Sequence, residues 1–260
     1  MNSPYTIILG AEGELGRALA REIARKKCNL IIVSTTSIDL QRFSIGLQLK
    51  HDIQVNAVKL DLSNQDEIHA FTQSVLEMYE IRALINNITC DWSTAENKCV
   101  SELTKDDFQT RFRGAALLTW NLLPQLKGLS ASYIQHIIPF PFRKEHFNVD
   151  LQHSVAKMYA FTKELEEELK DTGVSVSMVH PAPIKNIMQQ MENLGRIFEE
   201  DIQTLEPGLI ASKAVNGMLR GDRLIIPGLR NKIQFYLNRH ATSWFRSSEE
   251  SVDPSLQPSV

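Results

Sequence analysis

Short apolar runs alternate with longer segments of helical periodicity along almost the whole chain. Each short run is bounded by glycine, proline or polar residues, as is typical of a buried strand. The expected strands are residues 5–9, 30–33, 54–60, 82–87, 133–138, 174–179 and 224–226. The expected helices are residues 14–26, 38–50, 64–79, 104–123 and 151–170, with further helical sequence as far as residue 219. This alternation predicts an α/β fold with a single doubly wound parallel sheet and helices on both faces.

Polar residues and proline mark several of the expected boundaries. Asn64 is followed three residues later by Glu67, which is the pattern of a capping box at the start of a helix. Pro124 lacks the backbone N–H that a helix interior needs, so we expect the helix at 104–123 to end there. No internal repeat separates a second unit, and residues 247–260 are rich in Ser, Glu and Pro. We therefore expect a single domain over residues 1–246 and a flexible tail over 247–260.

Composition and charge place the chain among ordinary globular proteins. Its 260 residues are 43% hydrophobic, and the formal net charge of -3 gives no reason to expect nucleic acid as a partner. Cys28, Cys90 and Cys99 have no Cys-x-x-Cys spacing, which favours a reducing compartment over a disulfide framework. The amino-terminal apolar run is too short to cross a membrane and lacks the basic flank of a signal peptide. These features predict a cytoplasmic protein without a transmembrane segment.

Three glycines, Gly10, Gly13 and Gly16, follow the first apolar run, and a helical pattern begins at Leu15. Glycines at such a turn let the backbone approach a pyrophosphate, and the N-terminus of the following helix offers unpaired N–H groups and a positive dipole end. A strand-to-helix turn that binds nothing also needs glycine. The spacing therefore favours a dinucleotide site, with a bare turn as the alternative.

Several motifs together resemble those of the short-chain dehydrogenase/reductase family over residues 4–228. They are the Gly-x-x-Gly-x-x-Gly turn, Asp61-Leu62-Ser63, Asn86-Asn87-Ile88-Thr89, and Gly173-Val174-Ser175-Val176 leading to His180-Pro181-Ala182-Pro183-Ile184. The turn matches the extended and atypical branches of the family, because the commonest branch has glycine in place of Glu14. The resemblance implies a Rossmann-type fold and a nicotinamide dinucleotide held by Gly10, Gly13, Leu15, Gly16, Ser34, Asp61, Leu62, Asn87 and Ile184.

The family's chemistry uses an Asn, a Ser, a Tyr and a Lys, in which the Tyr hydroxyl moves a proton and the Lys lowers the pKa of that hydroxyl. Phe161-Thr162 and Gly173 are family landmarks that set the register of the helix carrying the Tyr and the Lys, and Gly114 sets the position of the Asn. In this register the Asn, Ser, Tyr and Lys positions hold Arg111, Ile138, Leu151 and Val155. The resemblance therefore implies a degenerate member of the family that has lost carbonyl reduction.

Two other pairs on the same helix have the spacing of the family's Tyr and Lys. Tyr159 and Lys163 have the Tyr-x-x-x-Lys pattern itself. Alignment on this pair, however, moves the hydroxyl two helical turns, roughly 12 Å, away from the nicotinamide position. His153 and Lys157 need only a two-residue shift, and a histidine can transfer protons near neutral pH. A solvated helix face that carries a His and a Lys is the alternative to both.

The expected adenosine end of the cofactor site is also unusual. Ser34, Thr35 and Thr36 offer hydroxyls but no carboxylate at the end of the second strand, which weakly favours NADP(H) over NAD(H). Glu12 and Glu14 place two carboxylates on the loop that should face the pyrophosphate, where they would disfavour a dinucleotide. Alternatively, they favour the helix dipole and point to solvent. The sequence thus leaves open NADP(H) and no cofactor at all.

A basic segment precedes the tail. Residues 208–246 contain seven Lys or Arg residues and a single acid, Asp222, interleaved with apolar residues at helical spacing. A basic helix of this kind suits an acidic partner, a membrane surface or a neighbouring subunit. Because family members commonly pair through their fourth and fifth helices, the resemblance also implies a homo-oligomer or a heteromer with an active paralogue.

Three hypotheses remain from the sequence. The first is a catalytically degenerate binding or partner subunit with residual NADP(H) affinity. The second is a divergent NADP(H)-dependent oxidoreductase for a carbonyl or alcohol substrate, which uses His153 and Lys157 or unconventional groups. The third is a dimer-only scaffold that binds no nucleotide. Binding of NADP(H) would favour the first hypothesis over the third, and the absence of binding would favour the third.

Overall fold

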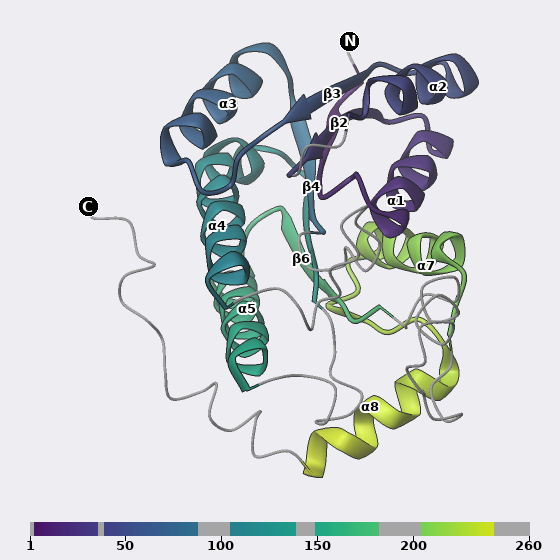
Figure 1. Ribbon diagram of the computed structural model, residues 1–260, viewed down its shortest axis with the longest axis vertical. Coiled ribbons are helices and arrows are strands. Elements are labelled where there is room, and N and C mark those ends of the chain that lie inside the picture. The colour runs from purple at the N-terminus through teal and green to yellow at the C-terminus, as the bar shows by residue number, and fades with distance from the viewer. Residues whose placement is uncertain (1–2, 36–38, 88–104, 139–148, 182–203, 242–260) are drawn as a thin grey trace.

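The computed structural model describes residues 3–35, 39–87, 105–138, 149–181 and 204–241. Within them, a seven-stranded parallel sheet has the strand order β3-β2-β1-β4-β5-β6-β7 (Figure 1). The strands are β1 (Tyr5–Leu9), β2 (Asn29–Ser34), β3 (Val55–Lys59), β4 (Ile81–Asn86), β5 (Ser132–Ile137), β6 (Val174–Val179) and β7 (Leu224–Ile225). The expected strands are confirmed, with ends that differ by at most one residue. The strand order reverses between β1 and β4, which is the position at which such sheets bind ligands.

Both faces of the sheet are buried, and successive residues of a strand point to opposite faces. Ile7 and Leu9 of β1 belong to one hydrophobic cluster, whereas Ile8 between them belongs to the other. Ile31 and Ile32 of β2 divide in the same way. A parallel sheet covered on both faces needs apolar residues at every position, which explains why the strands appear in the sequence as unbroken apolar runs.

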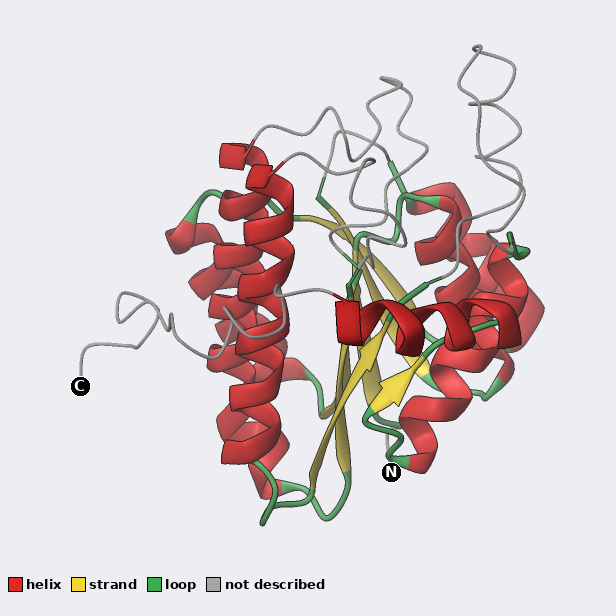
Figure 2. Cartoon of the chain, turned by 90° about the horizontal axis from the view of Figure 1, so that it is seen from below, coloured by secondary structure: helices red, strands yellow, loops and turns green. Residues whose placement is uncertain are grey.

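The helices form a separate layer on each face (Figures 1 and 2). On one face lie α3 (Gln65–Met78), α4 (Lys105–Gly128) and α5 (Val149–Glu168), and on the other lie α1 (Glu14–Arg25), α2 (Gln41–His51) and α7 (Pro207–Arg220). Leu15, Leu19 and Ile23 recur every four residues along α1 and are all buried. This stripe, which also set the helical pattern in the sequence, is the face with which α1 packs on the sheet.

Helix α4 contradicts one boundary expected from the sequence, because it continues through Pro124 to Gly128. A proline inside a helix removes one hydrogen bond and crowds the preceding turn, at a cost of about 3 kcal/mol. Leu122, Leu123 and Leu126 lie on either side of the proline and are almost fully buried. Burial of these side chains offsets the cost, since each contributes roughly 1.5–3 kcal/mol. The expectation that the helix stops at Pro124 is therefore wrong.

The start of α3 confirms the expected N-cap but not the whole capping box. The side-chain oxygen of Asn64 accepts a hydrogen bond from the backbone N–H of Glu67 at 3.2 Å. The Glu67 carboxylate instead accepts from the backbone N–H of Asp61 at 3.1 Å. Glu67 thus ties the helix to the loop that follows β3.

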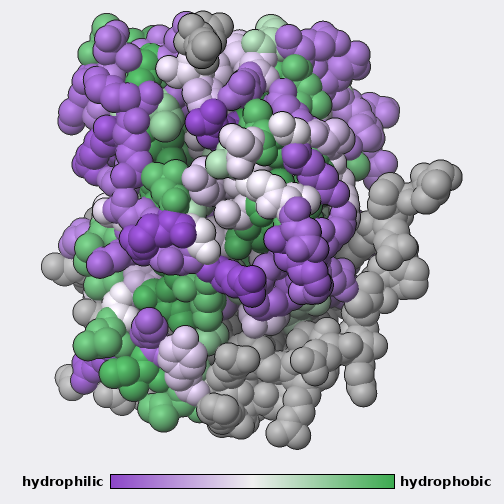
Figure 3. Space-filling model, turned by 180° about the vertical axis from the view of Figure 1, so that it is seen from behind, coloured by the Kyte–Doolittle hydropathy of each residue, from purple (hydrophilic) through white to green (hydrophobic). Residues whose placement is uncertain are grey.

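The last described helix, α8 (Leu229–Ala241), follows β7 and lies at the lower end of the fold in Figure 1. Leu229, Ile233 and Leu237 on this helix are exposed. Seen from behind, the upper part of the surface is largely hydrophilic, and hydrophobic side chains gather in the lower part (Figure 3). None of the described helices has the length and apolar character needed to cross a membrane. The tail expected over 247–260 lies outside the described residues.

Candidate functional site

The carboxyl ends of β1 and β4 meet at the glycine turn. Gly10 follows β1 with φ of 67°, a left-handed conformation that glycine adopts without steric cost. The side-chain Nδ2 of Asn87 donates a hydrogen bond to the Gly10 carbonyl oxygen at 2.9 Å, and the Asn87 N–H donates to the Leu9 carbonyl oxygen at 3.2 Å. Asn87 therefore ties the end of β4 to the turn after β1. Its Oδ1 is buried and has no hydrogen-bond partner among the described residues.

Packing of the turn requires two of its glycines whether or not a ligand binds. A Cβ on Gly10 would lie 2.1 Å from the Asn87 carbonyl oxygen, and a Cβ on Gly16 would lie 2.0 Å from the Gly10 carbonyl oxygen. Gly13 is the N-cap of α1 and provides no side-chain cap. The helix N-terminus thus lacks the side-chain oxygen that most N-caps supply, and its N–H groups suit an anion.

The loop after β3 contains the Asp61-Leu62-Ser63 motif. Asp61 Oδ1 accepts hydrogen bonds from the Ser63 N–H at 2.8 Å and the Ser63 hydroxyl at 2.7 Å. These two bonds lower the pKa of Asp61 below its ordinary value. Leu62 is buried, and a Cβ on Gly114 of α4 would lie 2.3 Å from the Leu62 carbonyl oxygen. The family landmark at Gly114 thus marks the close approach of α4 to this loop.

The Glu12 side chain reaches the end of β2. Its Oε1 accepts hydrogen bonds from the Thr35 N–H at 3.0 Å and the Thr35 hydroxyl at 2.7 Å. Glu12 is 4% exposed, and its other carboxylate oxygen, Oε2, is buried with no hydrogen-bond partner in the described part of the chain. Neither orientation expected from the sequence, toward the pyrophosphate or toward solvent, fits these contacts. No local sequence pattern indicates these contacts, because Glu12 and Thr35 lie 23 residues apart.

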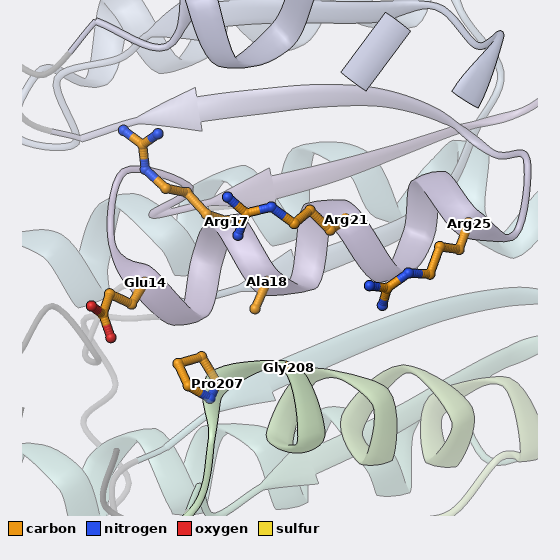
Figure 4. Close-up of a pocket in the computed structure, with 7 residues that line it drawn as sticks. All are labelled: Glu14, Arg17, Ala18, Arg21, Arg25, Pro207 and Gly208. Carbon is orange, nitrogen blue, oxygen red and sulfur yellow. The ribbon is translucent and has the colours of Figure 1, made fainter. Parts of the chain in front are cut away.

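Glu14 lies on the other side of the turn, in a groove of about 370 Å³ between α1 and the start of α7 (Figure 4). Figure 4 shows Glu14 and Arg17 pointing to opposite sides of α1. Arg17 Nε donates to the Glu12 carbonyl oxygen at 3.0 Å, and the guanidinium carbon lies 5.1 Å from the centre of the Phe43 ring. Arg21 also lines the groove. Its pKa is lowered mainly by burial, and further by the positive charges of Arg17 and Arg25.

Two of the four residues expected at the family's catalytic positions lie in the hydrophobic core. Ile138, expected at the Ser position, is fully buried directly after β5, and Val155, expected at the Lys position, is 1% exposed on α5. Both belong to the cluster that α3, α4 and α5 form against the sheet. Neither side chain can orient a carbonyl or hold a ribose by hydrogen bonds.

The remaining predicted site residues are described to different extents. Arg111 is half-buried on α4, and Lys157 is half-buried on α5. Leu151 and His153 lie on α5, but their side chains are outside the described part of the structure. Ile184 also lies outside it. Ser34 is buried at the end of β2, and Leu15 is buried on α1.

Tyr159 and Lys163, which have the Tyr-x-x-x-Lys pattern of the family, contact different neighbours. The Tyr159 ring stacks on His180 with the ring centres 6.4 Å apart. Lys163 Nζ lies 2.8 Å from Glu166 Oε2 in an ion pair, and the Lys163 side chain is 49% exposed. The Lys163 ammonium group is therefore directed to the surface rather than toward the tyrosine.

Two buried histidines were missed by sequence reasoning. His136 Nδ1 lies 2.7 Å from the Thr162 hydroxyl, and His180 Nδ1 lies 2.8 Å from the Ile138 carbonyl oxygen. Burial lowers the pKa of both residues to about 4. Both imidazoles are consequently neutral at pH 7. In the described part of the chain, no group of three or more His, Cys, Asp or Glu residues is placed to hold a metal ion.

The chain belongs to the short-chain dehydrogenase/reductase family, because the family model for short chain dehydrogenase matches residues 5–196. It is similar to retinol dehydrogenase 12 of Homo sapiens, with 29% identity over 78% of this chain and 69% of that protein. Retinol dehydrogenase 12 of Mus musculus is 32% identical over 68% of this chain. The match spans 60% of the length of that protein.

Solved structures share the fold at low sequence identity. A short-chain dehydrogenase from Sphingobium yanoikuyae in complex with NADPH has a TM-score of 0.71 and 20% identity, and the match covers 98% of each chain. A short chain dehydrogenase/reductase from Burkholderia phymatum in complex with NAD has a TM-score of 0.72 and 16% identity, covering 97% of this chain and 98% of that one. These similarities show that the chain has the same fold as the two dehydrogenases.

Proposed function

We propose that the chain is a nicotinamide dinucleotide-dependent oxidoreductase that acts on an alcohol or carbonyl substrate. The observation that carries the proposal is the bond from Asn87 to the Gly10 carbonyl oxygen, which closes the glycine turn at the uncapped N-terminus of α1. The buried oxygens Asn87 Oδ1 and Glu12 Oε2 have no protein partner among the described residues, so hydroxyl and amide donors of a dinucleotide fit this site. Family membership and the similarity to retinol dehydrogenases support the substrate class.

Each region of the site has a distinct binding role in this proposal. The backbone at Gly13 and the first turn of α1 would bind the pyrophosphate. Ser34, Asp61 and Leu62 would hold the adenosine, and Asn87, with Ile184, would lie along the nicotinamide half. The bound cofactor supplies the hydride chemistry.

Proton transfer would need a group other than the family's Tyr and Lys. Leu151 and Val155, expected at the Tyr and Lys positions, are apolar residues that cannot transfer a proton, so the proposed replacement is the pair His153 and Lys157, one helical turn apart on α5. A histidine in this role would give a rate that depends on pH near neutrality. Replacing His153 with Ala should then lower kcat by about 100-fold.

A second candidate function is a dinucleotide-binding subunit without hydride transfer. The burial of Ile138 and Val155 in the same hydrophobic cluster supports it, because these two residues, expected at the Ser and Lys positions, are apolar. Residual NADP(H) binding and pairing with an active paralogue belong to this candidate. Three other expectations from the sequence also stay predictions. They are self-association through α4 and α5, a contact between the basic α8 and an acidic partner, and a cytoplasmic location.

The test combines calorimetric titration with NADH and NADPH and a turnover assay with retinoid, steroid and short-chain alcohols and carbonyls. Binding together with turnover that His153→Ala abolishes supports the oxidoreductase. The control Lys163→Ala changes a surface ion pair and should leave turnover unchanged. Binding without turnover supports the second candidate, and the absence of binding contradicts both.

A further inference from the structure

We propose that Glu12 selects the dinucleotide and favours NAD(H) over NADP(H), an inference that rests on the proposed dinucleotide site. The buried Glu12 carboxylate is held against Thr35, the residue that directly follows β2. In Rossmann-type sites, an acidic residue near the end of the second strand binds the 2′-hydroxyl of the adenine ribose. Here the second strand ends without an acid, and Glu12 of the glycine turn after the neighbouring strand β1 supplies the carboxylate.

Two hydrogen bonds fix the position of this carboxylate. The Thr35 N–H and the Thr35 hydroxyl both donate to Glu12 Oε1, and Arg17 Nε donates to the Glu12 backbone carbonyl oxygen. The side chain and the main chain of Glu12 are thus held independently. Thr35 itself is partly exposed, so a ligand can approach this end of β2.

The second carboxylate oxygen, Oε2, is the atom to which the proposal assigns the ribose hydroxyl. Glu12 Oε2 is buried and has no partner among the described residues, and a buried acceptor without a donor is unfavourable. The 2′-hydroxyl of an adenine ribose is a donor of the kind that this oxygen needs. A 2′-phosphate offers only acceptors and negative charge at neutral pH, so it would leave the oxygen unpaired and be repelled by it.

The cations near the turn do not offset this repulsion. Arg17 is the cation in contact with Glu12, but its Nε is used by the Glu12 carbonyl oxygen and its guanidinium group lies over the Phe43 ring. Arg21 lies over the same ring at 5.2 Å. Ser34 and Thr35, at the end of β2, carry hydroxyls and no positive charge. The preference for NADP(H) inferred from the sequence considered only the residues at the end of the second strand, and Glu12 adds a negative charge there.

The test measures the Kd of NADH and NADPH by calorimetry for the wild-type chain, Glu12→Gln and Glu14→Gln. AMP and adenosine 2′,5′-bisphosphate are titrated as well, because they probe the ribose region without the nicotinamide. The wild-type chain should bind NADH and AMP at least about tenfold more tightly than their 2′-phosphorylated counterparts. Glu12→Gln keeps the volume and removes the charge, so it should reduce both ratios to within about threefold. Glu14→Gln should leave both ratios unchanged.

The outcomes separate this inference from the proposed function. Tighter binding of NADPH by the wild-type chain, or ratios that Glu12→Gln does not change, overturns the role of Glu12 and leaves dinucleotide binding intact. If neither dinucleotide nor AMP binds, the proposed function fails and the inference fails with it. A thermal melt of Glu12→Gln checks folding. If that variant does not fold, the two wild-type ratios decide, because a preference for the 2′-phosphorylated ligands still overturns the proposal.

Discussion

The imidazole of His180 donates a hydrogen bond from Nδ1 to the carbonyl oxygen of Ile138, at a distance of 2.8 Å. The bond links the residue after β6 to the residue after β5, and both side chains are buried. Because a carbonyl oxygen only accepts, the proton lies on Nδ1. His180 also stacks on Phe235 of α8 at 5.2 Å, so a single side chain connects two strand ends to the last described helix.

Replacing His180 with Ala should lower the free energy of unfolding by about 2–4 kcal/mol, because the variant loses this bond and leaves a cavity. Urea denaturation at pH 7.5 measures the effect. The control is His69→Ala, at an exposed position of α3, which should cost less than about 1 kcal/mol. Equal losses in the two variants would contradict the structural role of His180.

Stability should fall steeply as the pH is lowered from about 6.5 toward 4, because the folded-state pKa values of His136 and His180 are about 4, against an ordinary value of 6.5. In this window the unfolded chain binds more protons than the folded chain, so acid favours unfolding. Each histidine contributes about 2 kcal/mol of loss between pH 7 and pH 5. Urea titrations at pH 7, 6 and 5 should show this trend, and His136→Gln should reduce it by about half. A flat profile would rule out neutral buried histidines.

Gly16→Ala should destabilise the chain by about 3 kcal/mol or more, because its Cβ would lie 2.0 Å from the Gly10 carbonyl oxygen. Gly46→Ala is the matched control on α2, since a Cβ there meets nothing within 4 Å. The control should be neutral or more stable by up to about 1 kcal/mol, as alanine is the better helix former. Thermal melts compare the two variants, and a tolerated Gly16→Ala would contradict the packing of the turn.

Val155→Lys, which places the family's lysine at its expected position, should destabilise the chain by about 3 kcal/mol or more. The amine would enter the hydrophobic cluster in which Val155 is 1% exposed, and desolvation of its charge is unfavourable there. Val155→Met adds a side chain of similar length without charge and should cost about 1–3 kcal/mol. Denaturation at pH 7 and pH 9 separates charge from size, because deprotonation of the lysine at pH 9 should recover part of the loss. If Val155→Lys is as stable as the wild type, burial of position 155 in the hydrophobic core is contradicted, because the amine then reaches a polar site.

Local patterns were sufficient for most of the fold. Apolar runs located every strand to within one residue, and Leu15, Leu19 and Ile23 identified the buried face of α1 before any contact was known. Pro124 was misjudged because its local cost is offset by the burial of leucines on both sides of it. Burial depends on how α4 packs against the sheet, and no local pattern contains that information.

The sequence by itself determined the family and the position of the glycine turn, because these follow from residue identity and spacing. Only the tertiary structure decided where the Glu12 carboxylate lies and which neutral histidines are buried in the core. The physical reason is that a hydrogen bond or a desolvated group depends on distances between residues far apart in the chain. Glu12 and Thr35 are 23 residues apart and meet only because β1 and β2 lie side by side in the sheet.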